Sequence, residues 1–443
     1  MKRDLAKIFE DFIKNAEDMN ARISADTEAY RKGRAKITIT VGGKPADGAK
    51  VNFEQKSHEF KFGANCFMLD ELESDEKNTR YKQLFADAFN LATVPFYWNT
   101  LEPEKGKPRF AADSPKIYRR PAPDLCLDFC EKHGIEPKLH CLNYDQFSPS
   151  WYTSAPLNEQ KILLEKRMRE IAERYAEKIP DIEVTNEHVW PISRSSPMYL
   201  WEDGAEWSYK TAEKYFHGNN LIINEGPNNT WWLADKPVEK QGYYLLIKNL
   251  KERGARIDKI GMQYHIWDYK PDTYENTRVI FDPVCLYREM DAYSKLAPEL
   301  QVTEITLPAK GAEPDDEEYQ AEVLEKLYRI WFSHRNMQAV IYWNLVDGYA
   351  FGAKQGDMSA GENIYYGGLV NFDMTPKLAY KKLQKLTKEE WHTSESRVCN
   401  SEGKTDFRGF YGKYSAEIVV GGKKFEKEIF VSKYSKNEIA IEL

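Results

Sequence analysis

The chain has 443 residues, enough for one large domain with a small one beside it, and its 63 Lys and Arg against 70 Asp and Glu give a net charge of −7. This charge argues against nucleic acid as a partner, because a polyanion needs a basic face, and the sequence lacks the apolar run of ~20 residues that a transmembrane helix requires. Aromatic residues make up 13% of the chain, including 11 Trp and 27 Tyr. They indicate either a core filled with rings or flat surfaces on which a ligand stacks.

Both ends of the chain predict small elements. The first twenty residues interrupt their apolar positions with charges, which predicts an amphipathic helix and no signal peptide. Residues 35–55 alternate apolar and polar side chains around a Gly-Gly-Lys-Pro turn, which predicts a β-hairpin, and residues 407–443 alternate in the same way between glycine turns. Because neither β segment can bury a core alone, we expect the two to pack together as one small β-sandwich-like unit.

The middle of the chain alternates strand-like and helix-like segments. Each of eight apolar runs is followed by helical periodicity, and eight such units are the number in a (β/α)8 TIM barrel. Strands buried on both faces read as nearly continuous apolar runs, as most of these do. A doubly wound sheet shows the same alternation, but no Gly-x-Gly-x-x-Gly or P-loop follows the first strand. The eight runs are residues 60–67, 89–96, 135–142, 181–187, 220–225, 257–265, 300–307 and 337–344.

The sequence therefore predicts an α/β fold in four segments. Residues 1–30 form a helix, 31–58 an N-terminal β segment, 59–390 the barrel, and 391–443 a C-terminal β segment that packs with the N-terminal one. The six cysteines show no CxxC pair and no Cys/His group at zinc spacing, so we expect free thiols and no metal. Free thiols and the missing leader indicate the cytoplasm, whereas a chain trimmed of its leader would be secreted.

Polar residues gather at the carboxyl ends of the predicted strands, where barrels carry their chemistry. Strand four ends at Glu187 and strand seven carries Glu304. One strand-end glutamate alone is more often solvated or ion-paired, but two with hydrogen-bonding and stacking neighbours indicate an active site. These neighbours are Asn186, Gln263, His265, His140, Asn143, Asp145, Trp343, Asn344 and Asp347.

Paired carboxylates without a metal cluster, a phosphate loop or a Ser/Cys nucleophile motif match the cleavage of a glycosidic bond. One carboxyl must be a protonated acid that donates to the departing oxygen, and the other an ionised nucleophile or base. We expect Asn186 to donate a hydrogen bond to a sugar hydroxyl and His265 to keep the carboxylate of strand seven ionised and oriented.

From Phe60 to Leu386 the chain resembles glycoside hydrolase family 10, whose best-known members are endo-β-1,4-xylanases. The segments that carry the resemblance are FKFGAN, FNLATVPFYWNTLEPEKGKPRF with Trp98, Glu102, Pro103 and Gly106, LHCLNYDQFSPSWY with His140, Pro149 and Trp151, TNEHVW, GMQYH, VTEI, IYWNLVDGYAF and GGLVNFDMTPKLAY. Their order and separation along the chain make the resemblance specific.

The resemblance implies that Glu187 is the acid/base and Glu304 the nucleophile. By implication the enzyme retains anomeric configuration through a covalent glycosyl intermediate, which requires carboxyl groups about 5 to 5.5 Å apart. No cofactor is expected, and the partner is a carbohydrate or glycoside. The residues predicted to bind it are Asn186, His140, Asp145, Gln263, His265, Trp343, Tyr97, Trp98, Tyr144 and Phe351.

The chain departs from the family in residues that bind the sugar. Glu, Asn and Lys of typical xylanases appear here as Thr93, Val94 and Tyr97. A His and a Trp of the third strand appear as Asp145 and Tyr144, and a Trp of the eighth-strand loop appears as Phe351. Polymeric β-1,4-xylan or xylo-oligosaccharides are therefore one candidate substrate, and a short β-glycoside or a sugar on an apolar aglycone is another.

Other interpretations of the same residues stay open. Asn224 and Glu225 repeat the Asn-Glu pair of strand four, and we interpret Glu225 as a supporting or solvated residue. A cluster of tryptophans is either a sugar-stacking rim or a set of loop clamps: Trp201, Trp207, Trp231, Trp232 and Trp267. The alternative of another class is a carbohydrate-binding protein that has lost turnover, although binding alone does not need an acid and nucleophile pair.

Overall fold

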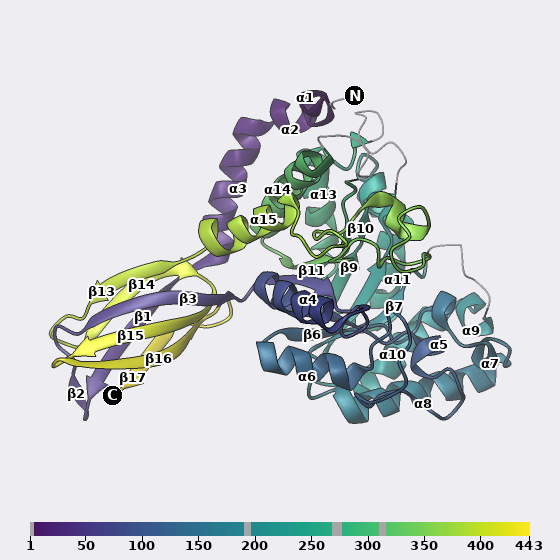
Figure 1. Ribbon diagram of the computed structural model, residues 1–443, viewed down its shortest axis with the longest axis horizontal. Helices are drawn as coiled ribbons and strands as arrows, with labels where there is room; N and C mark the ends of the chain where they lie inside the picture. The colour runs from purple at the N-terminus through teal and green to yellow at the C-terminus, as the bar shows by residue number, and fades with distance from the viewer. Residues whose placement is uncertain (1–3, 190–195, 268–276, 310–315) are drawn as a thin grey trace.

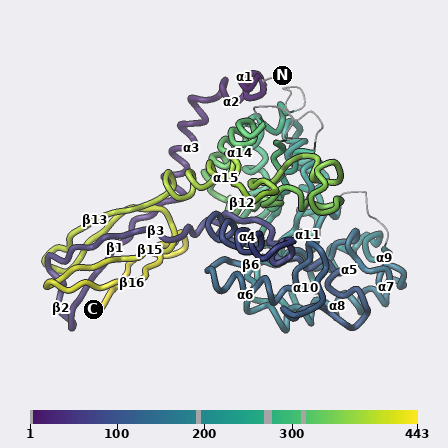
Figure 2. Tube along the Cα trace, in the orientation of Figure 1, coloured from purple at the N-terminus to yellow at the C-terminus, as the bar shows by residue number. Residues whose placement is uncertain are grey.

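The computed structural model describes residues 4–189, 196–267, 277–309 and 316–443. Figure 1 shows a barrel surrounded by helices and, beside it, an elongated β-sandwich. In the tube of Figure 2 the purple N-terminal and yellow C-terminal strands lie side by side in the sandwich. The N-terminal and C-terminal β segments therefore form one unit, and the middle of the sequence forms the other.

The barrel is a closed parallel sheet in which each strand pairs with the next along the chain. Pairing of β12 with β4 and of β11 with β9 closes it, and β9 and β10 share one position, so the described residues fill eight positions. The predicted (β/α)8 fold class is confirmed. The strands are β4 (Lys61–Asn65), β5 (Leu91–Pro95), β6 (Glu136–His140), β7 (Asp181–Asn186), β8 (Asn220–Glu225), β9 (Lys259–Met262), β10 (Tyr264–His265), β11 (Glu299–Thr306) and β12 (Met337–Tyr342).

A helix follows each strand position and covers the outside of the barrel (Figure 1). Local signals set the ends of these helices: the Ser74 hydroxyl accepts a hydrogen bond from the backbone of Lys77 at the start of α4, and Gly134, with φ of 64°, ends α6. The outer helices are α4 (Asp75–Ala88), α6 (Pro123–His133), α8 (Leu157–Tyr175), α10 (Gly204–Tyr215), α11 (Gly242–Glu252), α13 (Pro283–Tyr293), α14 (Asp316–Ser333) and α15 (Leu378–Lys385).

Short helices lie in the connections. They are α5 (Trp98–Leu101), α7 (Ser150–Thr153) and α9 (Pro197–Leu200), with single turns at Asp145–Phe147, Pro227–Asn229, Trp231–Leu233, Val238–Lys240, Gly361–Tyr365 and Leu386–Glu390. Most of them follow the carboxyl ends of strands, so they build the walls above the barrel mouth.

The sandwich combines N-terminal and C-terminal strands in each of its two sheets. One sheet has the order β14-β1-β17, with β2 beside β1, and the other has the order β13-β3-β15-β16. Phe53 of β3 and Phe407 of β14 stack across the core with ring centres 4.4 Å apart. The strands are β1 (Lys32–Val41), β2 (Lys44–Pro45), β3 (Lys50–His58), β13 (Ser394–Val398), β14 (Lys404–Phe410), β15 (Gly412–Val420), β16 (Lys423–Val431) and β17 (Glu438–Glu442).

The predicted hairpin between the two alternating runs of residues 35–55 is wrong in its pairing. The Gly-Gly turn joins β1 only to the two residues of β2, and β3 lies in the opposite sheet. Both strands present an apolar face, so Ile37 of β1 and Phe53 of β3 are buried in the common core between the sheets. Each strand finds its long pairing partners among C-terminal strands.

The N-terminal helical segment consists of α1 (Leu5–Ile8), α2 (Glu10–Lys14) and α3 (Ala16–Arg31). It ends at Arg31, whose buried guanidinium donates to backbone carbonyl oxygens of the barrel, among them that of Met337 at 2.7 Å. None of the described helices combines the length and the apolar composition that a membrane span needs.

Candidate active site

The carboxyl ends of the barrel strands surround a cavity of about 350 Å³. This volume lies within the ~300–1,000 Å³ typical of small-molecule sites, at the end of the barrel where such sites are built. Nine of the residues predicted from the sequence line it: Tyr97, Tyr144, Asn186, Glu187, Gln263, His265, Glu304, Trp343 and Phe351.

Glu304, near the end of β11, is buried and receives hydrogen bonds on both carboxylate oxygens. The Asn224 and Gln263 side-chain amides donate to Oε1 at 2.9 and 3.1 Å. His265 Nε2 lies 3.2 Å from Oε2. Three N–H donors of this kind orient a carboxylate and oppose the rise in pKa that the burial of Glu304 causes. Glu304 is therefore held with its carboxylate fixed at the cavity wall.

His265 contacts Glu304 as a neutral ring. Burial lowers the pKa of His265 to about 4, so at neutral pH only one ring nitrogen carries hydrogen. Its Nδ1 lies 2.9 Å from the Thr306 hydroxyl, and when that hydroxyl donates to Nδ1, Nε2 carries the hydrogen that faces Glu304. The contact is a hydrogen bond and not an ion pair.

Glu187 follows β7 and is only partly buried. Its φ of 51° lies in the left-handed region, which costs a non-glycine residue of order 1–3 kcal/mol. Its backbone N–H donates to the Asn224 carbonyl at 3.0 Å, and the Tyr199 hydroxyl donates to its carbonyl oxygen. On its carboxylate, Gln263 Nε2 donates to Oε1 at 3.0 Å and the Tyr144 hydroxyl donates to Oε2. These bonds turn the side chain toward the cavity.

One amide group lies between the two glutamates. Gln263 Nε2 is 3.0 Å from Glu187 Oε1 and 3.1 Å from Glu304 Oε1. The sum of these distances, about 6 Å, is the largest separation the two oxygens can have. The carboxyl groups of Glu187 and Glu304 therefore share one amide donor.

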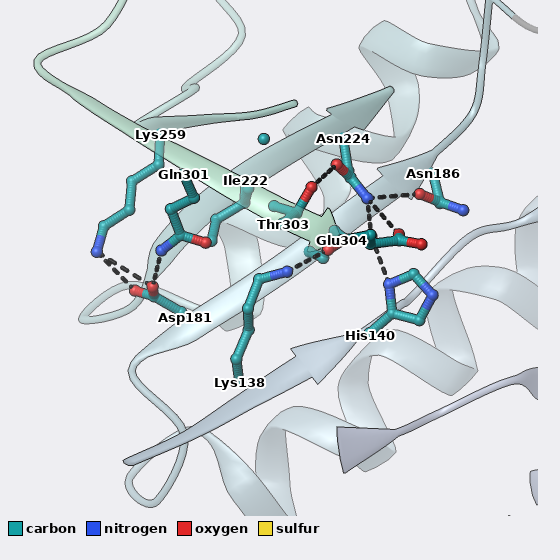
Figure 3. Close-up of polar contacts among 12 residues, drawn as sticks. Lys138, His140, Asp181, Asn186, Ile222, Asn224, Lys259, Gln301, Thr303 and Glu304 are labelled. Carbon is teal, nitrogen blue, oxygen red and sulfur yellow. Dashed lines mark hydrogen bonds and ion pairs between the residues drawn. The ribbon is translucent and has the colours of Figure 1, made fainter. Parts of the chain in front are cut away.

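Polar residues surround Glu304 and form a hydrogen-bonded network, of which Figure 3 labels Asn186, Asn224, Lys138 and His140. Asn224 Nδ2 lies within hydrogen-bond distance of Glu304, Asn186 and Glu183. Glu183 in turn bonds Lys138 Nζ at 2.5 Å and His140 Nδ1 at 2.7 Å. Burial alone would raise the pKa of Glu183, but these two neighbours outweigh it and leave the pKa at about 2.

Lys138→Met is expected to destabilise the protein by about 3–5 kcal/mol, because it leaves the buried carboxylate of Glu183 without its cation. The low pKa of Glu183 adds stability above its ordinary range near pH 4.5, and this stability is lost as pH falls toward 2. Urea unfolding at pH 7 measures the change. Lys61→Met is the control, since its partner Glu136 is partly exposed and the expected loss is below ~1 kcal/mol. Equal small losses in both variants would contradict this account.

Among the described residues, one group of possible metal ligands lies close enough together to share an ion. It consists of His140, Cys141 and Glu183. Glu183 already bonds Lys138 and His140. Burial raises the pKa of Cys141 far above its ordinary value, so the thiol stays protonated. The donor set therefore fits an internal ion-pair network better than a metal.

Three predicted binding residues do not line the cavity in the described structure. Trp98 donates through Nε1 to Glu102 at 2.8 Å and packs on Trp151, so the motif residues around it clamp a loop. Asp145 is buried and accepts from the backbone of Ser196. His140 lies one layer lower, between Glu183 and the Tyr97 hydroxyl. Each of these three side chains forms its hydrogen bonds with other groups of the protein and not at the cavity.

Of the predicted tryptophan cluster, Trp267 lines the cavity and stacks on the His265 ring, with centres 4.5 Å apart. Trp231 is fully buried against Tyr264 and belongs to the barrel core. Glu225 is also fully buried and accepts from the backbone of Val189 and Gly226. It supports the loop after Glu187, as interpreted from the sequence.

Sequence reasoning missed several lining residues that come from connections between elements. They are Arg119, Arg120, Gln146, Phe147, Gly226, Pro227, Asn228 and Glu362. Arg119 and Arg120 lie between α5 and α6, and Glu362 lies in the turn Gly361–Tyr365. Gln146 and Phe147 lie within the family-like segment LHCLNYDQFSPSWY, and the other six lie outside the strand runs and the family-like segments, so no periodicity pointed to them. Adjacent arginines are the only signal that the sequence offered.

A closed parallel barrel with two glutamates around one amide donor at its carboxyl mouth defines the chain as a (β/α)8 barrel protein with a paired-carboxylate site. The family model described as glycosyl hydrolase family 10 matches residues 54–386. The chain belongs to this family.

Relatives by sequence are distant. The anti-sigma-I factor RsgI6 of Acetivibrio thermocellus is 24% identical over 89% of this chain, and endo-1,4-beta-xylanase 2 of Arabidopsis thaliana is 23% identical over 94%. The chain spans 46% and 36% of the lengths of these two relatives. It covers 88% of endo-1,4-beta-xylanase B of Thermotoga neapolitana, which is 23% identical over 75% of this chain.

Solved structures share the barrel. Xylanase 10B of Thermotoga petrophila, crystallised in complex with xylobiose, has a TM-score of 0.59 at 22% identity over 75% of this chain and 95% of that one. Native xylanase 10B of Thermotoga maritima has a TM-score of 0.58 at 21% identity, over 75% of this chain and 96% of that one. These likenesses concern the fold.

Proposed function

We propose that the protein is a retaining β-glycoside hydrolase that uses Glu187 as acid/base and Glu304 as nucleophile. The observation that carries the proposal is the pair of glutamates bridged by Gln263, with nearest oxygens at most about 6 Å apart. This bound agrees with the ~5–5.5 Å between carboxyl groups of retaining enzymes, whereas inverting enzymes need ~6.5–9.5 Å to admit a water. Membership of glycosyl hydrolase family 10 supports it.

The reaction has two displacements. In the first, a carboxylate oxygen of Glu304 attacks the anomeric carbon, the bond to the leaving oxygen breaks, and Glu187 gives that oxygen its proton. In the second, the Glu187 carboxylate takes a proton from water, the water oxygen attacks the same carbon, and the ester to Glu304 breaks. The nucleophile and the acid are regenerated, and the configuration is restored after two inversions.

The substrate best supported is xylan-type, a β-1,4-xylan or xylo-oligosaccharide. Xylanases among the relatives and the xylobiose complex of the Thermotoga petrophila protein favour it. Typical xylanases bind the sugar through three positions that are Thr93, Val94 and Tyr97 in this chain. Thr93 and Val94 are buried in the barrel, and Tyr97 alone of the three lines the cavity. The rings of Tyr97, Phe147 and Phe351 on the cavity wall favour the alternative, a short β-glycoside with an apolar aglycone.

The proton NMR spectrum of the first product tests the proposal. Xylo-oligosaccharides and aryl β-xylosides are hydrolysed, and the anomer formed before mutarotation is recorded. We expect the β-anomer first. An α-anomer as first product would overturn the retaining mechanism, and sugar binding without hydrolysis of any β-glycoside in the panel would favour the carbohydrate-binding alternative.

The kcat/KM of the protein is expected to rise with pH along a limb near pH 8. Burial raises the pKa of Glu304 to about 8, with Glu183 and Glu187 adding to the rise and His140 opposing it. Glu304 attacks as a carboxylate, so the fraction of the protein that can react grows as pH rises through about 8. Rates on an unactivated xyloside between pH 4 and 10 measure this. A kcat/KM that falls steadily from pH 6 to pH 9 would contradict it.

A further inference from the structure

The wall of the cavity contains the buried guanidinium of Arg120, a charged group that the binding of a neutral sugar does not require. Arg120 lines the cavity and is 7% exposed. Its Nη1 donates to the Arg119 carbonyl oxygen at 2.8 Å, whereas its Nε has no hydrogen-bond partner. Within the described part of the chain, no carboxylate forms an ion pair with it. A buried charge without a counterion is costly, so its presence at a cavity needs a reason.

Aromatic rings hold this guanidinium in place. Its carbon lies 4.1 Å from the centre of the Tyr97 ring, 5.2 Å from Phe67 and 5.5 Å from Phe147. Cation–π contacts fix the plane of a guanidinium without using its N–H groups. Nη1 uses one of its two hydrogens for the Arg119 carbonyl. Its second hydrogen and the two of Nη2 make no hydrogen bond in the described structure, and together they match the two oxygens of a carboxylate.

Arg119, which also lines the cavity, adds a second positive charge. Its Nη1 donates to the Tyr349 carbonyl and lies 3.2 Å from Asn344 Oδ1, while its Nε has no partner. The nearest acidic group of this wall is Glu362, which accepts from Asn344 Nδ2 at 3.2 Å and is not bonded to either arginine. Two guanidiniums against one carboxylate leave this part of the cavity positive.

We propose that Arg120, supported by Arg119, forms an anion subsite of the catalytic cavity, and that the natural substrate is a β-glycoside carrying a carboxylate. The proposal rests on the proposed hydrolase function and narrows its substrate class. The carboxylate belongs either to a uronic acid in the sugar chain or to the aglycone. Both sources present the same planar anion to Arg120.

Two matched pairs of substrates test the subsite. In one pair an aryl β-xyloside carries a carboxylate on its aryl group or the methyl ester of that acid. In the other a xylo-oligosaccharide carries a uronic acid or its methyl ester. The acid and the ester have nearly the same shape, so the ratio of their kcat/KM values reports the charge. We expect a ratio of about 10 or more in one pair, and that pair identifies the source of the carboxylate.

Variants assign the effect to Arg120. Arg120→Gln is expected to bring the acid/ester ratio close to 1, and Arg120→Lys to keep part of it, because the charge remains and the fork is lost. Arg34→Gln is the control, since this exposed arginine pairs with Asp406 in the sandwich. A purely structural role of Arg120 would lower both rates and leave the ratio unchanged. A wild-type ratio of 1 or below in both pairs, or an unchanged ratio in Arg120→Gln, would overturn the proposal.

The anion subsite can be tested separately from the proposed hydrolase function. If no β-glycoside is cleaved, the proposed function falls, and calorimetry with the same four compounds still tests the subsite. Binding of an acid at least tenfold tighter than its ester, lost in Arg120→Gln, supports the anion subsite. Equal affinities for acid and ester overturn it.

Discussion

Glu304→Gln is expected to lower kcat for an aryl β-xyloside by about 10⁴-fold or more, which corresponds to about 5 kcal/mol in the barrier. An amide cannot attack the anomeric carbon as a carboxylate does, so the covalent intermediate does not form. The fold should survive, because the amide oxygen can accept from Asn224 and Gln263 as Oε1 does. His265 can change tautomer and accept from the amide nitrogen while it donates to the Thr306 hydroxyl.

Glu289→Gln is the matched control for this variant. Glu289 on α13 is buried like Glu304, burial likewise raises its pKa to about 8, and it does not line the cavity. Because it is protonated at pH 7, an amide replaces it with the same charge. We expect its activity to stay close to that of the wild type. Glu304→Gln with wild-type turnover would remove Glu304 from the mechanism.

Glu187→Ala is expected to lower kcat/KM by about 10²–10⁴-fold for substrates with poor leaving groups and far less for dinitrophenyl glycosides. A leaving group of low pKa departs without a proton, so it does not need the acid. The second displacement also loses its base, so azide is expected to restore turnover and to give a β-glycosyl azide. Rates across a series of aryl leaving groups and NMR of the azide product measure both effects.

Glu225→Gln separates the acid from its neighbour on β8, which also follows an asparagine. Glu225 supports the backbone of Val189 and Gly226, so the substitution should cost less than about tenfold, by the same factor for all leaving groups. A loss in Glu187→Ala that is independent of the leaving group, or a leaving-group dependence that appears in Glu225→Gln, would contradict the assignment of the acid.

The barrel was predictable because its strands are buried on both faces. Runs such as residues 89–96 are apolar enough to stand out, and the end of a parallel strand is a defined place, so Glu187 and Glu304 were located by their positions near strand ends. The hairpin of residues 35–55 was wrong because alternation shows which face is buried, not which strand lies alongside. The pairing of β1 with β14 and β17 connects residues about 370 to 400 positions apart.

Within the site, the sequence did not indicate which side chains point into the cavity. The sequence placed Trp98 and Tyr97 side by side at the end of β5, yet Tyr97 lines the cavity and Trp98 packs behind it. Arg119 and Arg120 lie in a long connection whose path depends on contacts with the rings of Tyr97 and Phe147. Such contacts form only after the barrel is closed, so no local pattern predicts them.

The most direct measurement is covalent trapping of the intermediate. The protein is incubated with 2,4-dinitrophenyl 2-deoxy-2-fluoro-β-xyloside and, in parallel, with the corresponding β-glucoside. The fluorine slows both displacements, and the dinitrophenolate leaving group speeds only the first, so the covalent intermediate accumulates. The account predicts inactivation, release of one dinitrophenolate per chain, and one fluoroglycosyl group on the peptide that contains Glu304, seen by mass spectrometry. A label on the peptide of Glu187 or Glu225, or continued hydrolysis with no labelled peptide, would contradict it.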